Sequence, residues 1–165
     1  MASSLAAIVA AAKSKIWITN AYFAPRRRAV DALGAAALRG VDVRILLPGK
    51  SDVPIVRHAG HGHYAGLLQR GVRVFEYQPA ILHAKTAVAD DFLTLTGSSN
   101  LDFRSFHFNA ECNVVMLDSD MGRVFADAFE ADLKNAVEIT RDAWSRRNFL
   151  HVVGDRLARS LGPLL

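Results

Sequence analysis

The chain has 165 residues, 51% hydrophobic and 22% charged, with a formal net charge of +4, a composition that excludes a disordered chain and allows a buried core. Its single cysteine, Cys112, excludes an internal disulfide, and no apolar run reaches the roughly 18 residues that a membrane-spanning helix requires. Because the lysines of the first segment follow its apolar stretch, we expect no secretory signal, and these features favour a soluble, cytoplasmic protein.

Helix and strand signals alternate along the first half of the chain. Amphipathic spacing and capping residues predict helices over residues 3–12, 27–39 and 52–70. Short runs rich in branched and aromatic residues predict buried strands over residues 15–20, 41–48 and 72–78. Gly40 and Gly71 follow the second and third helices, where a left-handed residue commonly ends a helix.

The second half predicts shorter strands and two amphipathic helices. Strands are expected over residues 82–89, 92–97 and 111–117, with a turn at Asp90 and Asp91 between the first two. A helix beginning at Ser119 carries one apolar stripe, formed by Met121, Phe125, Phe129 and Leu133. The tail, about 140–165, predicts a further helix whose apolar stripe is formed by Leu150, Val153, Leu157 and Leu161. We expect this stripe to be buried against the domain or a second chain, and contact with a membrane is the alternative.

Alternating strands and helices with short connections indicate an α/β sandwich, in which helices flank a sheet. The hairpin expected over residues 82–97 is antiparallel, so the sheet is expected to be mixed but mostly parallel. The length suits a single domain over residues 1–165, ending in the helical tail.

Six residues form the pattern H-x-K-x4-D-x6-G-S-x-N: His83, Lys85, Asp90, Gly97, Ser98 and Asn100. Since His83 and Lys85 lie two apart on an expected strand, both side chains leave the same face of the sheet. An imidazole beside an ammonium group suits a phosphodiester reaction, because it supplies a nucleophile or proton donor and a charge for the nonbridging oxygens. Lys85, Ser98 and Asn100 are therefore the expected phosphate ligands, and Gly97 allows a close backbone approach.

Two acidic residues complete the candidate catalytic set. Asp90 lies at the hairpin turn and is expected to organise that turn more than to react. A histidine used in catalysis needs an orienting partner for its second ring nitrogen, and Glu111 is the candidate for His83. Glu111 begins an otherwise apolar strand, where a lone carboxylate is costly unless it is paired. Cys112 is then expected to face the other side as a small buried residue, not as a nucleophile.

Other polar clusters have simpler interpretations. His58, His61 and His63 suggest a metal site, but one helix does not point all three the same way, and no nearby cysteine or carboxylate completes the set. We expect exposed helix residues and no metal or other cofactor. The run 26–28 of three arginines can grip a phosphate, although a solvated helix start explains it equally simply.

The pattern resembles the signature of the phospholipase D superfamily, the HKD motif. Four longer segments resemble the cardiolipin synthase group of that superfamily: ITNAYFAP (18–25), RGVDVRILLPGKSD (39–52), AGLLQRGVRVFEYQPAILHAK (65–85) and GSSNLDFRSFHFNAECNVV (97–115). The resemblance implies a phospholipase D-like α/β sandwich that acts through a covalent phosphohistidine without metal. The last segment favours cardiolipin synthases over nuclease relatives, which depart from the pattern after the asparagine.

The resemblance also implies that this chain is one half of an active site. Cardiolipin synthases carry two such motifs, and the matching segments here are those of the second half. In two-motif relatives the second-half histidine is usually the general acid and base, so His83 would take that role. The expected partner is a missing N-terminal half or, in a homodimer, a second copy of the chain.

Three functions remain open on these grounds. The first is phosphatidyl transfer with a phosphatidylglycerol-like substrate, with peripheral contact at the inner membrane face. The second is a homodimeric phosphodiesterase or nuclease, and the third is an inactive half-enzyme fragment. Residues 1–80 hold 11 Lys or Arg against 4 Asp or Glu, whereas residues 81–165 hold 9 against 12. This basic first half suits phospholipid headgroups or nucleic acid, or is an ordinary solvated surface.

Overall fold

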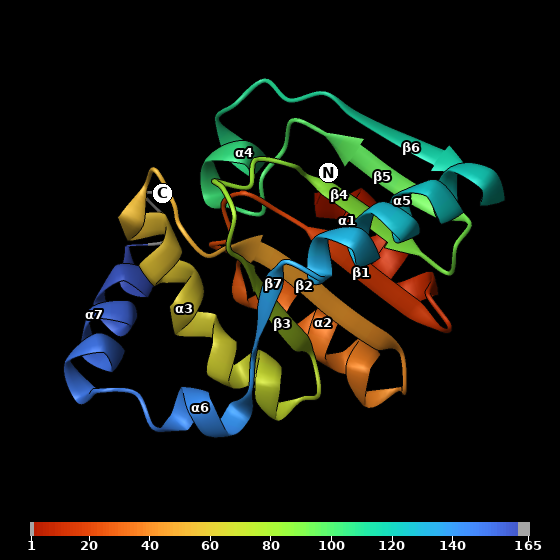
Figure 1. Cartoon of the computed structure of the whole chain (residues 1–165). Coiled ribbons are helices and arrows are strands. Elements are labelled where there is room, and N and C mark those ends of the chain that lie inside the picture. Colours follow the sequence, from red (N-terminus) through yellow and green to blue (C-terminus); the bar gives the residue numbers. More distant parts are fainter. Residues whose placement is uncertain (1, 162–165) are drawn as a thin grey trace.

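The computed structural model describes residues 2–161, with side chains described for residues 5–161. Its strands form one mixed sheet of seven strands in the order β6-β5-β4-β1-β2-β3-β7 (Figure 1). The strands are β1 (Lys15–Thr19), β2 (Asp42–Pro48), β3 (Arg73–Tyr77), β4 (Thr86–Ala89), β5 (Leu93–Gly97), β6 (Asn113–Leu117) and β7 (Ala136–Ile139). The expected α/β sandwich with a mixed sheet is therefore confirmed.

The sheet is less parallel than the sequence suggested. Only the β1–β2 and β2–β3 pairs are parallel, whereas β1–β4, β4–β5, β5–β6 and β3–β7 are antiparallel. The hairpin between β4 and β5 is confirmed, and Asp90 and Asp91 form its turn with positive φ angles of 52° and 53°. Short polar residues tolerate this left-handed region better than others do.

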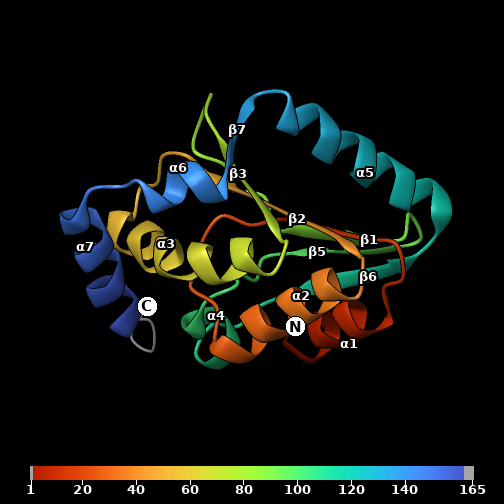
Figure 2. The ribbon, with the colours of Figure 1, turned by 90° about the horizontal axis from the view of Figure 1, so that it is seen from below.

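Helices cover both faces of the sheet unequally (Figure 2). The first three helices, α1 (Ala2–Ala11), α2 (Arg27–Leu38) and α3 (Pro54–Gln69), cover one face, and α5 (Ser119–Leu133) crosses the other. The short helices α4 (Phe103–His107) and α6 (Arg141–Ser145) lie at the periphery, and α7 (Phe149–Ser160) packs beside α3. Gly40 and Gly71 adopt φ angles of 91° and 86°, as their positions after helices predict.

Two apolar cores follow from the alternation of side chains along β1. Ile16 and Ile18 pack with residues of α1, α2 and α3 in the larger core, whereas Trp17 points to the other face. There Trp17 stacks on Phe129 of α5 with 5.3 Å between ring centroids. Such an aromatic pair contributes roughly 1 kcal/mol beyond its buried area. Phe125, Phe129 and Leu133 of the predicted α5 stripe pack in this second core, whereas Met121 is 38% exposed.

The last quarter of the chain differs most from expectation. Strand β7 was not predicted, and it pairs antiparallel with β3 at one edge of the sheet. The helical tail is confirmed as α6 and α7, but burial of its stripe against the domain is wrong, because Leu150 and Leu157 are 74% and 64% exposed. Instead α7 buries Asp155 and Ala158 against α3. None of the helices within residues 2–161 combines the length and apolar character needed to cross a bilayer.

Candidate active site

All residues of the HKD pattern except Asp90 meet at one edge of the sheet, which we call the motif edge. Parallel strands β1, β2 and β3 end there, and Thr19 at the end of β1 pairs with Thr86 at the start of β4. His83 and Lys85 come directly before β4, and Ser98 and Asn100 directly after β5. The segment before β6 brings Glu111 to the same edge, because Gly97 pairs with Asn113. Ligands of α/β proteins commonly bind outside the carboxyl ends of strands.

His83 and Lys85 lie before the strand and not on it, contrary to the sequence prediction. The reason is that β1 ends at the level of Thr86, so the residues before Thr86 have no strand partner on that side. His83 is exposed, and the edge of its ring faces Tyr22 with 5.7 Å between centroids. Tyr22 in turn donates its hydroxyl hydrogen bond to the Asp52 carboxylate at 2.8 and 2.9 Å. The histidine is thus accessible and has an aromatic neighbour that is itself anchored.

Lys85 is a buried cation with three carboxylates acting on its charge. Its side chain is buried, and Nζ donates a hydrogen bond of 2.6 Å to the backbone carbonyl oxygen of His83. Burial lowers the pKa of Lys85, while the negative charges of Glu111, Asp102 and Asp52 act in the opposite direction. A cation in this position attracts an anionic group that enters the motif edge.

Asn100 is buried and its Oδ1 atom makes no hydrogen bond to any described residue. Its backbone amide donates to Ser105 Oγ at 3.1 Å, which fixes the backbone but leaves the carboxamide unused. Buried side-chain polar atoms are mostly paired, so an unpaired carboxamide at this edge suits a ligand. Which end of the carboxamide faces that ligand depends on its flip.

Glu111 binds Ser98 instead of His83. Its carboxylate accepts hydrogen bonds from Ser98 Oγ and, at 3.3 Å, from Asn109 Nδ2, and no hydrogen bond joins it to His83 in the described part of the chain. The pKa of Glu111 is lowered, first by the Ser98 hydrogen bond and then by Asn109, Ser105 and the charge of Lys85. Glu111 therefore stays ionised and draws positive charge toward the motif edge.

Gly97 allows a close backbone approach, as predicted, whereas Cys112 differs from its prediction. A Cβ atom on Gly97 would lie 2.3 Å from the Cys112 carbonyl oxygen and 2.7 Å from Asn113 Cα. The glycine thus serves the close approach of β5 and β6, not that of a ligand. Cys112 is exposed, so its expected burial is wrong. It lies before β6, the edge strand of the sheet, where no further strand covers it.

Asp90 lies at the opposite end of β4 from His83 and Lys85. Lys85 and Asp90 are five residues apart, which corresponds to roughly 16 Å at the rise of an extended strand. Both carboxylate oxygens accept backbone hydrogen bonds: 2.9 Å from Lys13, 2.8 Å from Ser14 and 2.9 Å from Lys15. Burial acts to raise the pKa of Asp90, but these hydrogen bonds outweigh it and lower the pKa to about 2. Asp90 organises the turn, as its sequence position predicts, and takes no place among the residues at the motif edge.

The three histidines of α3 have different environments, and none is the exposed residue that we expected, since His58 and His63 are partly buried and His61 is buried. His61 is buried, with Nε2 3.0 Å from Glu76 Oε1, and His58 Nδ1 lies 2.9 Å from Asp155 Oδ1. His58, His61 and Asp155 have the geometry of a possible metal triad. However, Asp155 already pairs with Arg147 at 2.6 Å, so a cation there would compete with an existing partner. The carboxylate that the sequence analysis did not find is Asp155, which α7 brings next to α3.

The residue pattern did not single out Tyr22, which faces His83, or Asp52, which binds Tyr22. The signal for Tyr22 was its place within ITNAYFAP (18–25), which resembles a family segment. Asn20 in the same segment accepts a hydrogen bond from the Leu101 amide at 3.0 Å and so positions the chain after Asn100. This segment therefore supports the motif edge from β1.

Comparison with known proteins identifies relatives of this arrangement. The sequence profile of the family "Cardiolipin synthase, PLD-like domain" matches residues 5–133. Cardiolipin synthase 2 of Bacillus anthracis is 38% identical over 159 residues, which are 96% of this chain and 31% of that protein. Cardiolipin synthase A of Pseudomonas syringae is 40% identical over 155 residues, 94% of this chain and 32% of that protein. The chain thus spans about a third of the length of these relatives.

Solved structures with the same fold come from two size classes. Nuc of Salmonella typhimurium, a phospholipase D family member, superposes with a TM-score of 0.75 at 20% identity, over 84% of this chain and 90% of that one. The phosphatidylserine synthase of Haemophilus influenzae gives 0.73 at 12% identity, over 97% of this chain and 42% of that one. The fold is therefore phospholipase D-like, and it occurs both as nearly a whole chain and as less than half of one.

Proposed function

Because the chain belongs to the PLD-like domain family of cardiolipin synthases, we propose that it forms one half of a phosphatidyltransferase active site. The observation that carries this proposal is the grouping of His83, Lys85 and Asn100 at one edge of the sheet, with the Lys85 ammonium buried and the Asn100 carboxamide unpaired. These groups suit a phosphodiester such as that of phosphatidylglycerol. The chemistry belongs at a membrane surface, where such substrates reside.

The proposed reaction is a double displacement. A histidine nucleophile of the partner half attacks the phosphorus, forms a P–N bond and breaks the bond from phosphorus to the first alcohol. His83 gives its proton to that leaving oxygen. A second alcohol then passes its proton to His83 and attacks the phosphorus, which releases the first histidine. Lys85 and Asn100 stabilise the charge on the nonbridging oxygens, and Glu111 tunes the field around Lys85.

The proposed reaction needs a partner half in addition to this chain. One histidine cannot lie on both sides of the phosphorus, so a single copy of this unit lacks either nucleophile or acid. The chain spans about a third of the length of its cardiolipin synthase relatives, which favours a partner unit within a longer protein. Its superposition on 90% of the Nuc chain favours the pairing of two copies. In both arrangements two motif edges would face one phosphate.

A phosphodiesterase or nuclease is the second candidate. It is favoured by the same near-complete overlap with Nuc and by the excess of basic residues in the first 80 positions. An inactive half is the third candidate, because the chain carries a single HKD pattern.

One set of assays separates these candidates. The chain is incubated with phosphatidylglycerol vesicles and, separately, with DNA, with and without EDTA. We expect phosphatidyl transfer that survives EDTA and disappears in His83→Ala, while His151→Ala, which replaces another exposed histidine, keeps it. Cleavage of DNA alone would support the nuclease, and no turnover in a confirmed dimer would support the inactive half. Loss of activity on chelation, with rescue by zinc, would contradict the phosphohistidine mechanism.

A further inference from the structure

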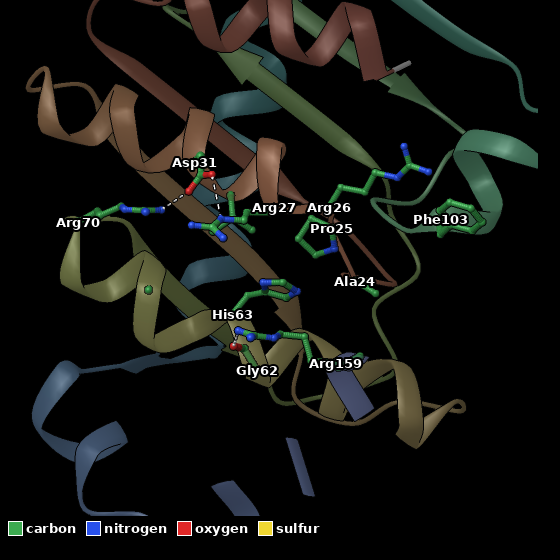
Figure 3. Close-up of a pocket in the computed structure, with 13 residues that line it drawn as sticks. Ala24, Pro25, Arg26, Arg27, Asp31, Gly62, His63, Arg70, Phe103 and Arg159 are labelled. Atoms are coloured by element: carbon green, nitrogen blue, oxygen red, sulfur yellow. Dashed lines mark hydrogen bonds and ion pairs between the residues drawn. The ribbon is translucent and has the colours of Figure 1, made fainter. Parts of the chain in front are cut away.

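A pocket of about 510 Å³ lies between α2 and α3, next to α4 and α7 (Figure 3). Its walls come from segments far apart in the sequence, from Ala24 to Arg159. None of His83, Lys85, Asn100 and Glu111 is among the residues that line it. The pocket is therefore separate from the motif edge.

Positive charge dominates this pocket. Among the described residues that line it, Asp31 is the one acidic residue. Four lining residues are arginines: Arg26, Arg27, Arg70 and Arg159. Asp31 is already bound by Arg70 Nη1 at 2.9 Å and lies 3.6 Å from Arg27 Nε. The single negative charge of Asp31 therefore neutralises only part of the combined positive charge of Arg70 and Arg27.

The other two arginines have no acidic partner among residues 5–161. Arg159 donates one hydrogen bond, from Nη1 to the Gly62 carbonyl oxygen at 3.0 Å, and its remaining donors are free of side-chain partners. Arg26 lies over the ring of Phe103 at 4.7 Å. Figure 3 shows Arg26 and Arg159 at different sides of the pocket, with His63 between the helices. Guanidinium groups without a carboxylate are suited to a phosphate group.

His63 adds a neutral polar group to the pocket. Its pKa is lowered to about 4, first by burial and second by the charge of Arg159. The imidazole is therefore neutral near pH 7 and offers a polar contact without further charge. An anion next to it would raise this pKa, which gives a spectroscopic reporter inside the pocket.

Shape and lining indicate more than a bare phosphate ion. The volume falls within the range of about 300–1,000 Å³ that small-molecule sites occupy. Pro25, Val30 and Phe103 supply apolar surface beside the arginines. Gly66 also lines the pocket, and no atom lies within 4 Å of the position of an added Cβ, so a larger residue there has room to fill the space.

We propose that this pocket is an accessory binding site for a phosphate ester, with the phosphate held by Arg26 and Arg159 and the organic part against Phe103 and Pro25. The ligand chemistry is that of a phosphate group esterified to a small organic part, either in a soluble ester or in the headgroup of an anionic phospholipid. The site is independent of the reaction proposed for His83, since it is built from other residues.

The test measures binding to the whole chain by calorimetry, with three probes: inorganic phosphate, sn-glycerol 3-phosphate, and vesicles of phosphatidylglycerol compared with phosphatidylcholine. Arg26→Gln and Arg159→Gln should each weaken binding about ten-fold or more, because each removes a charge-assisted contact. Matched controls are Arg28→Gln and Arg156→Gln, which replace exposed arginines of the same segments that do not line the pocket. Gly66→Leu should block binding without loss of thermal stability.

The outcomes are distinct. Weaker binding in Arg26→Gln, Arg159→Gln and Gly66→Leu but not in the controls supports the site, and so does a rise in the His63 pKa on addition of glycerol phosphate. Binding of the soluble ester identifies a solute, and binding of phosphatidylglycerol vesicles alone identifies a lipid headgroup. Equal weakening in the controls would mean diffuse surface attraction and would overturn the proposal. Loss of binding in His83→Ala, or no binding of any probe, would overturn it as well.

Discussion

Replacing Asp90 by Asn should destabilise the fold without changing turnover. The carboxylate accepts three backbone hydrogen bonds and one from Ser14 Oγ, and asparagine keeps one acceptor oxygen and tolerates the positive φ. The pKa of Asp90 falls from 3.8 to about 2, which corresponds to about 2.5 kcal/mol. Since the group is partly solvated, screening reduces the expected loss to about 1–2 kcal/mol at pH 7.

The pH dependence gives the sharper test. The folded chain binds this proton less tightly than the unfolded chain does, so the stabilisation is complete above about pH 5 and is lost as pH falls from about 4 toward 2. Urea unfolding of both proteins at several pH values should show a constant gap that closes in acid. Asp91→Asn is the control, because it removes only one ion pair, with Lys15, at a partly exposed position of the same turn. An unchanged unfolding free energy at pH 7, or a loss of turnover with intact stability, would refute this account of Asp90.

Three further changes test the motif edge and its surroundings. Lys85→Met should abolish turnover and yet raise the unfolding free energy by about 1 kcal/mol in urea titrations, because it removes a buried charge. Gly97→Ala should destabilise by about 2 kcal/mol or more, since its Cβ would overlap the backbone of β6, whereas Gly66→Ala should stabilise by up to about 1 kcal/mol. The lowered pKa of His63 makes stability fall as pH drops from about 6.5 to about 4. His63→Leu should remove most of that fall, about 2 kcal/mol, in unfolding curves at pH 7 and pH 4.5.

Features set by local chemistry were predictable from the sequence. Gly40 and Gly71 end helices, and two adjacent aspartates turn the hairpin, because their backbone preferences act within a few residues. The HKD pattern brought His83, Lys85, Ser98 and Asn100 to one edge, because the pairing of β4 with β1 and β5 aligns the strand ends.

Features set by partners far along the chain were not predictable in this way. The apolar alternation of residues 82–89 suggests a strand, but where β4 begins depends on where β1 ends. Strand β7 has only four residues and forms because β3 offers a free edge. The pairing of His58 with Asp155 likewise depends on the packing of α7 against α3, 97 residues later in the chain.

Assembly offers the last prediction, and it follows from the single histidine of the motif. If two copies share one phosphate site, a pair of wild-type chains holds both the nucleophile and the acid, whereas a mixed pair with His83→Ala lacks one of them. Random pairing in an equimolar mixture leaves only about a quarter of the pairs fully wild type, so activity per total chain should fall to about a quarter, not to a half. The proteins are mixed, allowed to exchange and assayed on phosphatidylglycerol vesicles, with sedimentation to confirm dimers and His151→Ala as the mixing control. A decrease to one half would show that each chain works alone, and a monomer that turns over substrate would have the same meaning.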